Sequence, residues 1–187
     1  MKPALLRHPA SRLISPYQQG QLDFLCGLYA LLNALRLLYA PNRLLSRRAC
    51  EKLFALGLES LGSRPTASYA AHCGMTIERQ AKLAKLILRS TGLQNLPQVL
   101  LRPALPRITS VGELDGAVRS AISHGDVLLV CFEGRLSHHS VIVGVSASRV
   151  VLSDSIGMHF VSKASLQLGA KPRGTLIVDG LAPIGLR

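Results

Sequence analysis

Three kinds of reactive side chain occur in this sequence in an order that could support acyl transfer. Cys26 lies between a polar, glycine-containing loop and a strongly helical run, and the adjacent His138 and His139 begin a strand-like run. Asp154 ends the next strand-like run. A thiolate can attack a carbonyl carbon, an imidazole can move the proton, and a carboxylate can orient the imidazole. These side chains are therefore the parts of a nucleophile, a base and an orienting group.

The segment that follows Cys26 predicts a buried helix. From Leu28 it reads LYALLNALRLLY, whose leucines and alanines are good helix formers, and Pro41 ends the run. Only Asn33 and Arg36 interrupt its apolar surface, which indicates burial on most sides. The unpaired N–H groups and the dipole at a helix N-terminus favour negative charge, so a cysteine placed there is more readily a thiolate.

Strand geometry separates the two histidines. Side chains alternate along a strand, so His139 shares a face with Val141, whereas His138 shares one with Ser140. The imidazole that works with Asp154 is expected on the same face as that carboxylate.

The turn between the two strands decides on which face Asp154 lies. A two-residue loop at 147–148 places Asp154 opposite Val141, on the face of the second histidine. A three-residue loop at 146–148 places it opposite Ser140, on the face of the first histidine. The residues of the turn do not fix its length, so both pairings stay open.

These segments together resemble the papain-like cysteine peptidases of the broad type that includes the C39-like bacterial enzymes. In such families a loop glutamine, often followed by glycine, precedes the cysteine that opens a central helix. A histidine then begins a strand, and an Asp or Asn follows on the neighbouring strand. The matching residues are Gln19-Gly20, Cys26-Gly27, His138 and Asp154, within about residues 17–40 and 137–157.

The resemblance implies a role for each matched residue. Cys26 would be the nucleophile, His138 the base and Asp154 its orienting group, with the Gln19 amide completing an oxyanion hole. His138 is preferred because the family pattern places an aromatic residue directly after the histidine, a position that His139 fills, and a glycine six positions on, which is Gly144.

Other residues are alternatives for these roles. Counted to Cys26, Gln19 is one residue farther than the commonest papain spacing and Gln21 is one residue nearer, so Gln21 and Asp23 are alternatives for the oxyanion hole, and His139 for the base. The weaker candidates are Asp126, Asp179 and His159, while Cys50 and Cys131 are expected in the core.

The function that the resemblance implies is hydrolysis of an amide bond, in a peptide or an isopeptide, through a Cys-His-Asp site and an acyl-enzyme. The substrate would be a protein or a peptide, and neither a cofactor nor a metal is expected. A glutamine deamidase or a transglutaminase-type effector using the same residues is an alternative. From another class, the alternative is an inactive basic binding module for nucleic acid or an acidic protein.

Composition and charge limit the remaining possibilities. The chain has 187 residues, of which 48% are hydrophobic, enough for one domain with a substantial core. Its four cysteines are irregularly spaced and predict neither a disulfide scaffold nor a zinc site, and we interpret the adjacent His72 and Cys73 as ordinary loop residues. The net charge of +12 permits nucleic-acid binding, but no aromatic residues are interleaved with the basic groups for base stacking. Solvated helix faces explain these groups better: Arg43, Arg47, Arg48, Lys52, Arg79, Lys82, Lys85 and Arg89.

The N-terminal segment does not resemble a secretory signal. Charged residues and a proline interrupt its apolar character at Arg7, Pro9 and Arg12. The most apolar stretch, Leu25–Tyr39, is shorter than the roughly 18 residues that span a bilayer, so no membrane span is expected. We therefore expect a cytoplasmic protein, with secretion as an effector as the alternative.

The remaining pattern predicts helices first and strands later. Ser46 and Thr76 can each cap a helix, and Ser110 with Glu113 has the spacing of a capping box that opens a third, ending near Gly125. Strand-like runs follow from residue 126, and VLLR at 99–102 could be a short edge strand. The expected fold is α+β and papain-like, with a central buried helix packed on a C-terminal antiparallel sheet. Its expected parts, within a single domain of residues 1–187, are an N-terminal segment 1–15, a mainly helical lobe 16–125 and a mainly β lobe 126–187.

Overall fold

The helices of the computed structural model lie where the capping signals place them. The structure describes residues 5–20, 23, 25–61, 75–89, 98–134, 136–168 and 176–186. Within these residues there are four α-helices: α1 (Cys26–Tyr39), α2 (Arg47–Ser60), α4 (Ile77–Arg89) and α5 (Val111–Ser123). The Ser46 and Ser110 hydroxyls accept hydrogen bonds from Ala49 N and Glu113 N, and the Thr76 hydroxyl accepts one from Arg79 N. All three predicted helix starts are confirmed.

The sheet draws its strands from both ends of the chain. It contains β1 (Leu6–Arg7), β2 (Val99–Leu101), β3 (Val127–Gly134), β4 (His138–Val145), β5 (Arg149–Ser153), β6 (Phe160–Ser162), β7 (Leu166–Gln167) and β8 (Leu176–Leu186). The order is β2-β8-β3-β4-β5-β6, with β1 pairing with β4 and β7 with β8. The β7–β8 pair is parallel and the other described pairs are antiparallel. The expectation of an α+β chain with an antiparallel sheet is confirmed.

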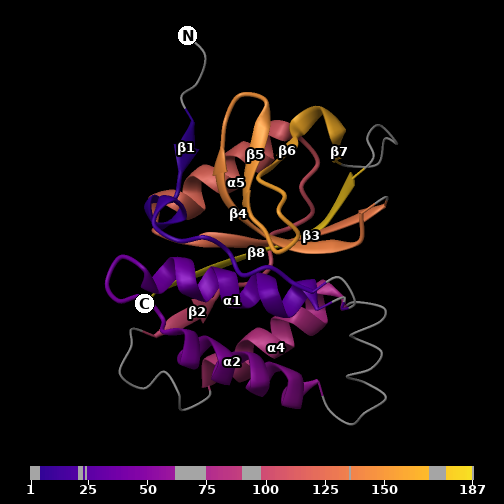
Figure 1. Cartoon of the computed structure of the whole chain (residues 1–187). Helices are drawn as coiled ribbons and strands as arrows, with labels where there is room; N and C mark the ends of the chain where they lie inside the picture. Colours follow the sequence, from indigo (N-terminus) through magenta and orange to yellow (C-terminus); the bar gives the residue numbers. More distant parts are fainter. Residues whose placement is uncertain are drawn as a thin grey trace.

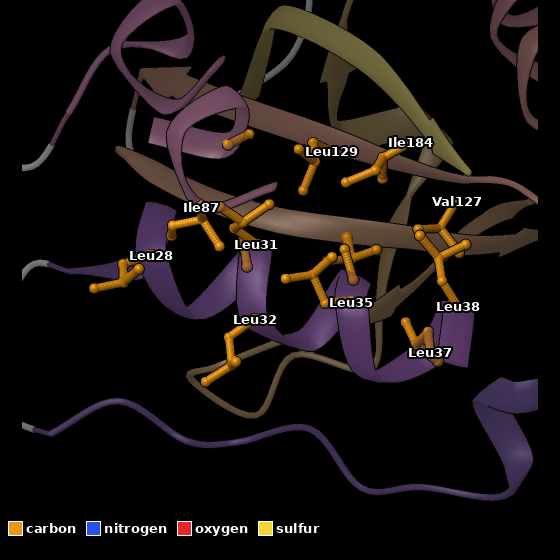
Figure 2. Close-up of a cluster of buried hydrophobic side chains, with 14 of the residues drawn as sticks. Leu28, Leu31, Leu32, Leu35, Leu37, Leu38, Ile87, Val127, Leu129 and Ile184 are labelled. Carbon is orange, nitrogen blue, oxygen red and sulfur yellow. The ribbon is translucent and has the colours of Figure 1, made fainter. Parts of the chain in front are cut away.

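Helix α1 lies between the sheet on one side and helices α2 and α4 on the other (Figure 1). All of its residues except Tyr29 and Arg36 are buried. Figure 2 shows Leu31 beside Ile87 of α4 and Leu38 beside Val127 of the sheet, while Leu32 and Leu37 lie on the opposite side of the helix. Full burial of one leucine side chain stabilises a fold by roughly 1.5–3 kcal/mol, so this interface holds α1 firmly in place.

The two polar residues of α1 hold the loop that precedes it. The Asn33 amide is buried, accepts a hydrogen bond from Tyr17 N at 2.7 Å and donates one to Tyr17 O at 3.1 Å. Arg36 donates to Ser15 O at 2.7 Å, and its guanidinium lies 4.1 Å from the centre of the Tyr17 ring. The interruptions in the apolar pattern of this helix are therefore attachment points for residues 15–17.

Both faces of the sheet are covered by helices. Leu129 of β3 packs in the cluster of α1, while its neighbours Leu128 and Val130 pack in the cluster of α5. Helix α5 therefore lies on the opposite face from α1, and strands β1 and β2 from the earlier part of the chain join the sheet. The short strand expected at 99–102 is confirmed as β2, whereas the two-residue strand β1 is too short to give a periodic signal. An amphipathic helix, in turn, does not show which face of a sheet it will cover.

The β4–β5 hairpin has the two-residue loop, but Asp154 lies on the face expected for the three-residue loop. Val145 pairs with Val150, and Ser146 N donates to Arg149 O at 2.9 Å, so the turn has the two-residue loop 147–148. The register then shifts between Ile142 and Gly144, and Val141 pairs with Ser153. Continued by one residue, this register places Asp154 opposite Ser140. The expectation that a two-residue loop places Asp154 opposite Val141 is wrong, because a β-bulge adds a residue to β4.

Strand β1 approaches β4 closely beside this bulge. Arg7 pairs with Gly144, and His8 N donates to Val143 O at 2.7 Å. A Cβ atom placed on Gly144 would lie 2.5 Å from Leu6 O, a backbone atom that cannot move without displacing β1. Glycine is thus required here for a close approach of two backbones.

Among the described residues, no helix is long and apolar enough to cross a membrane.

We predict that Gly144→Ala lowers the free energy of unfolding by about 1–3 kcal/mol, because the added methyl group displaces β1 from β4. Gly116→Ala is the matched control, since a Cβ atom there meets nothing within 4 Å and the residue is exposed on α5. That control should gain about 0.5–1 kcal/mol from helix propensity. Urea unfolding measures both, and an unchanged stability of Gly144→Ala would contradict the close approach.

Candidate functional site

Cys26 is the first residue of α1, at the place where this helix meets the start of β4. Its side chain is buried, with 5% exposure, and its Sγ accepts a hydrogen bond from His139 N at 3.4 Å. The sulfur is thus held by a peptide N–H of the strand as well as by its own helix. Two segments more than a hundred residues apart in sequence meet at this atom.

His138, the first residue of β4, joins Cys26 to Asp154. Its Nε2 lies 2.7 Å from Asp154 Oδ2, and both side chains are almost fully buried. Its other ring nitrogen, Nδ1, is then the one available to Cys26, whose hydrogen bond and charge act on the imidazole. The structure therefore pairs Asp154 with His138 and not with His139.

Asp154 is oriented by the turn that follows β5. Its Oδ1 accepts hydrogen bonds from Ile156 N at 2.8 Å and Met158 N at 3.2 Å, which leaves Oδ2 for His138. The bulge in β4 is what brings Asp154 to this face of the hairpin. Backbone geometry thus fixes which oxygen faces the imidazole.

Cys26, His138 and Asp154 interact so that the pKa values of His138 and Asp154 shift towards their charged forms. Burial alone lowers the pKa of His138, but the hydrogen bonds and negative charges of Asp154 and Cys26 outweigh it and raise the pKa to about 9. Burial raises the pKa of Asp154, and the hydrogen bond and charge of His138, with smaller effects of the Ser140 hydroxyl and Ile156 N–H, bring it below its ordinary value. At neutral pH the site therefore holds an imidazolium between a carboxylate and a sulfur. Such an arrangement can stabilise a thiolate and donate a proton to a leaving group.

Gln19, expected to complete an oxyanion hole, is attached to the residue after Asp154. Its backbone N donates to Ser155 O at 2.9 Å, and its side-chain oxygen accepts from the Ser155 hydroxyl at 3.1 Å. Its amide nitrogen donates to Asp23 O at 3.3 Å. The neighbouring Gln18, which the sequence did not single out, donates to Asp154 O at 3.1 Å.

The two alternatives for the oxyanion hole have different outcomes. Gln21 lies outside the described residues. The Asp23 carboxylate accepts hydrogen bonds from Gly20 N at 3.0 Å and Leu25 N at 3.2 Å, so it closes the loop before α1. Both carboxylate oxygens of Asp23 therefore bind backbone N–H groups of its own loop.

The ring of His139 makes its contacts away from Asp154. Its Nδ1 lies 3.1 Å from Gln80 Oε1, and its Nε2 lies 2.5 Å from Met75 O. Gln80 was missed from the sequence, although it shares a helix face with Leu83, Ala84 and Ile87. A single polar residue at these spacings on an apolar face is the signal that could have identified it.

The weaker candidates lie elsewhere. Asp126 forms an ion pair with Arg102 at 2.7 Å, and His159 lines a cavity of about 360 Å³ beside Asp154. The side chain of Asp179 and the pair His72 and Cys73 lie outside the described part of the chain. Cys50 and Cys131 are buried, as expected of core residues.

In the part of the chain that the structure describes, no three His, Cys, Asp or Glu side chains lie close enough together to hold a metal ion. No family model matches this sequence, and no curated protein matches it significantly. The interpretation of the site therefore depends on its own geometry.

We predict that Asp154→Asn lowers the pKa of His138 from about 9 by more than about one pKa unit, because the negative charge beside the imidazolium is lost. NMR titration of the His138 imidazole measures this change. Asp115→Asn, which removes a carboxylate paired with Lys163, is the control and should leave His138 unchanged. A similar fall in both variants would contradict a specific effect of Asp154.

Proposed function

We propose that this protein is a papain-like cysteine hydrolase that cleaves an amide bond in a peptide or an isopeptide. The observation that carries the proposal is the sequence of contacts from Cys26 through His138 to Asp154. It joins a sulfur, an imidazole and a carboxylate in the order that acyl transfer requires. The helix that begins at the cysteine and the strand that begins at the histidine support the papain-like assignment.

In the first half of the proposed reaction, the Cys26 thiolate attacks the carbonyl carbon of the substrate. A C–S bond forms and the carbonyl π electrons move to oxygen, which gives a tetrahedral oxyanion. His138 then donates its proton to the amide nitrogen, the C–N bond breaks, and the amine leaves. The product of this half is a thioester on Cys26.

In the second half, neutral His138 takes a proton from water as the water oxygen attacks the thioester carbon. The C–S bond breaks, the carboxylic acid leaves, and the thiolate and imidazolium are restored. Asp154 stays ionised throughout and holds the imidazole in place.

The oxyanion is assigned to the backbone N–H of Cys26 and to the Gln19 amide. The dipole at a helix N-terminus favours negative charge, which suits an anion beside Cys26. The Gln19 amide nitrogen would have to leave Asp23 O, a contact of 3.3 Å that is long for a hydrogen bond. Its attachment to Ser155 keeps the side chain near the site during such a movement.

Selective alkylation tests the nucleophile without a known substrate. We predict that iodoacetamide at neutral pH labels Cys26 faster than the buried Cys50 and Cys131 in the folded protein, because His138 stabilises its thiolate. His138→Ala should slow the labelling of Cys26 by roughly a hundredfold or more, while His159→Ala should not. Mass-spectrometric peptide mapping assigns the rate to each cysteine.

Equal, slow labelling of the three thiols, together with salt-sensitive binding to DNA or RNA, would contradict the hydrolase and favour a basic binding module.

The pH profile tests the proton donor. Because the pKa of His138 is raised to about 9, imidazolium is present below that pH and is lost above it. Hydrolysis of a peptide selected from a cleavage-profiling library should therefore show kcat/KM falling above pH about 9, and Asp154→Asn should move this fall to lower pH. Alkylation of Cys26 needs no proton donor and should not fall in the same range. A decline of both reactions together would contradict the role given to His138.

A further inference from the structure

A buried amide, that of Gln80, connects the two segments that carry the proposed catalytic pair. Gln80 lies on α4, is fully buried, and donates from Nε2 to Gly27 O at 2.9 Å. Its Oε1 lies 3.1 Å from His139 Nδ1. Gly27 follows Cys26 and His139 follows His138, so one side chain contacts the neighbour of each reacting residue.

The junction around this amide is tightly packed. His139 Nε2 lies 2.5 Å from Met75 O, so the residue before α4's cap holds the other side of the ring. A Cβ atom on Gly27 would lie 2.5 Å from Met75 Sδ, which leaves no room between α1 and Met75. The start of α4 and the residue before its cap therefore contact both the first turn of α1 and the His139 ring of β4.

The hydrogen-bond partners of the His139 ring indicate its protonation state. The carbonyl of Gly27 requires a donor, which orients the Gln80 amide with Nε2 towards it and Oε1 towards His139. Both ring nitrogens of His139 then face carbonyl oxygens, those of Gln80 and Met75. A neutral imidazole has one N–H and can donate to only one of them. Only an imidazolium satisfies both.

We propose that Gln80 is a positioning residue for the reaction of Cys26, acting through Gly27 and through a His139 ring that carries a proton on each nitrogen. This inference rests on the proposed function, because it concerns the distance between Cys26 and His138. Two polar contacts of one buried side chain fix the start of α1 relative to the start of β4. Their loss lets the sulfur and the imidazole separate, and a displacement of about 1 Å at a reacting atom can cost about a hundredfold in rate.

Two substitutions separate the two contacts of Gln80. Gln80→Met has a similar length and removes both hydrogen bonds. Gln80→Glu keeps an acceptor for His139 and removes the donor to Gly27 O. Leu83→Ala is the control, because Leu83 is buried on the same helix and its truncation weakens the packing of α4 without touching the amide.

The experiment measures iodoacetamide labelling of Cys26 in the full-length protein, the thermal unfolding midpoint, and the nitrogen-15 NMR signals of the His139 ring at neutral pH. Wild type should show two protonated ring nitrogens on His139. Gln80→Met should slow labelling by about ten- to a hundredfold and leave one protonated nitrogen. Gln80→Glu should keep both protons and slow labelling less. Leu83→Ala should lower the unfolding midpoint and change neither labelling nor the ring signals.

Three results would overturn the inference. One is a wild-type His139 ring with a single proton, which needs no variant to fold. Another is Gln80→Met labelling as fast as wild type, and the third is Leu83→Ala slowing labelling as much as Gln80→Met. Slow labelling of wild-type Cys26 would instead overturn the proposed function, so the two failures are distinguishable.

Discussion

The packing of α1 between the sheet and helices α2 and α4 is the constraint on which the site depends. A helix with apolar side chains on nearly its whole surface is stable only where that surface is buried, and α1 is buried in the core. That environment sets the position of its first residue, and Cys26 therefore meets the start of β4. Two polar side chains that enter this interior, Asn33 and Gln80, each make two hydrogen bonds. Their contacts hold the loop before α1 and the strand beside it.

Burial also explains the chemistry proposed for the site. Charges taken out of water interact strongly, and a buried charge without a partner is costly, so each charged group there needs an opposite charge or hydrogen bonds. The Asp154 carboxylate and the His138 imidazolium compensate one another, and the imidazolium also interacts with the sulfur of Cys26. The backbone N–H groups of residues 156 and 158 satisfy the second oxygen of the carboxylate. The site is thus arranged by peptide groups as much as by side chains.

Much of this arrangement could be predicted from sequence, because its signals are local. The caps at Ser46, Thr76 and Ser110 depend on a few adjacent residues, and the apolar run after Cys26 indicated a buried helix. The bulge in β4 could not be predicted, because its surroundings include β1, which pairs with Gly144 from the other end of the chain. For the same reason the face that α5 covers and the partners of Gln80 needed coordinates. Each is a relation between distant segments that no local pattern encodes.

The central claim is that Cys26 and His138 form a thiolate–imidazolium pair. Ultraviolet absorbance of the thiolate tests this claim most directly. The difference spectrum between wild type and Cys26→Ser at neutral pH should contain a thiolate band, and the band should be lost when His138 is replaced by Ala. A difference spectrum without that band at neutral pH would contradict the account.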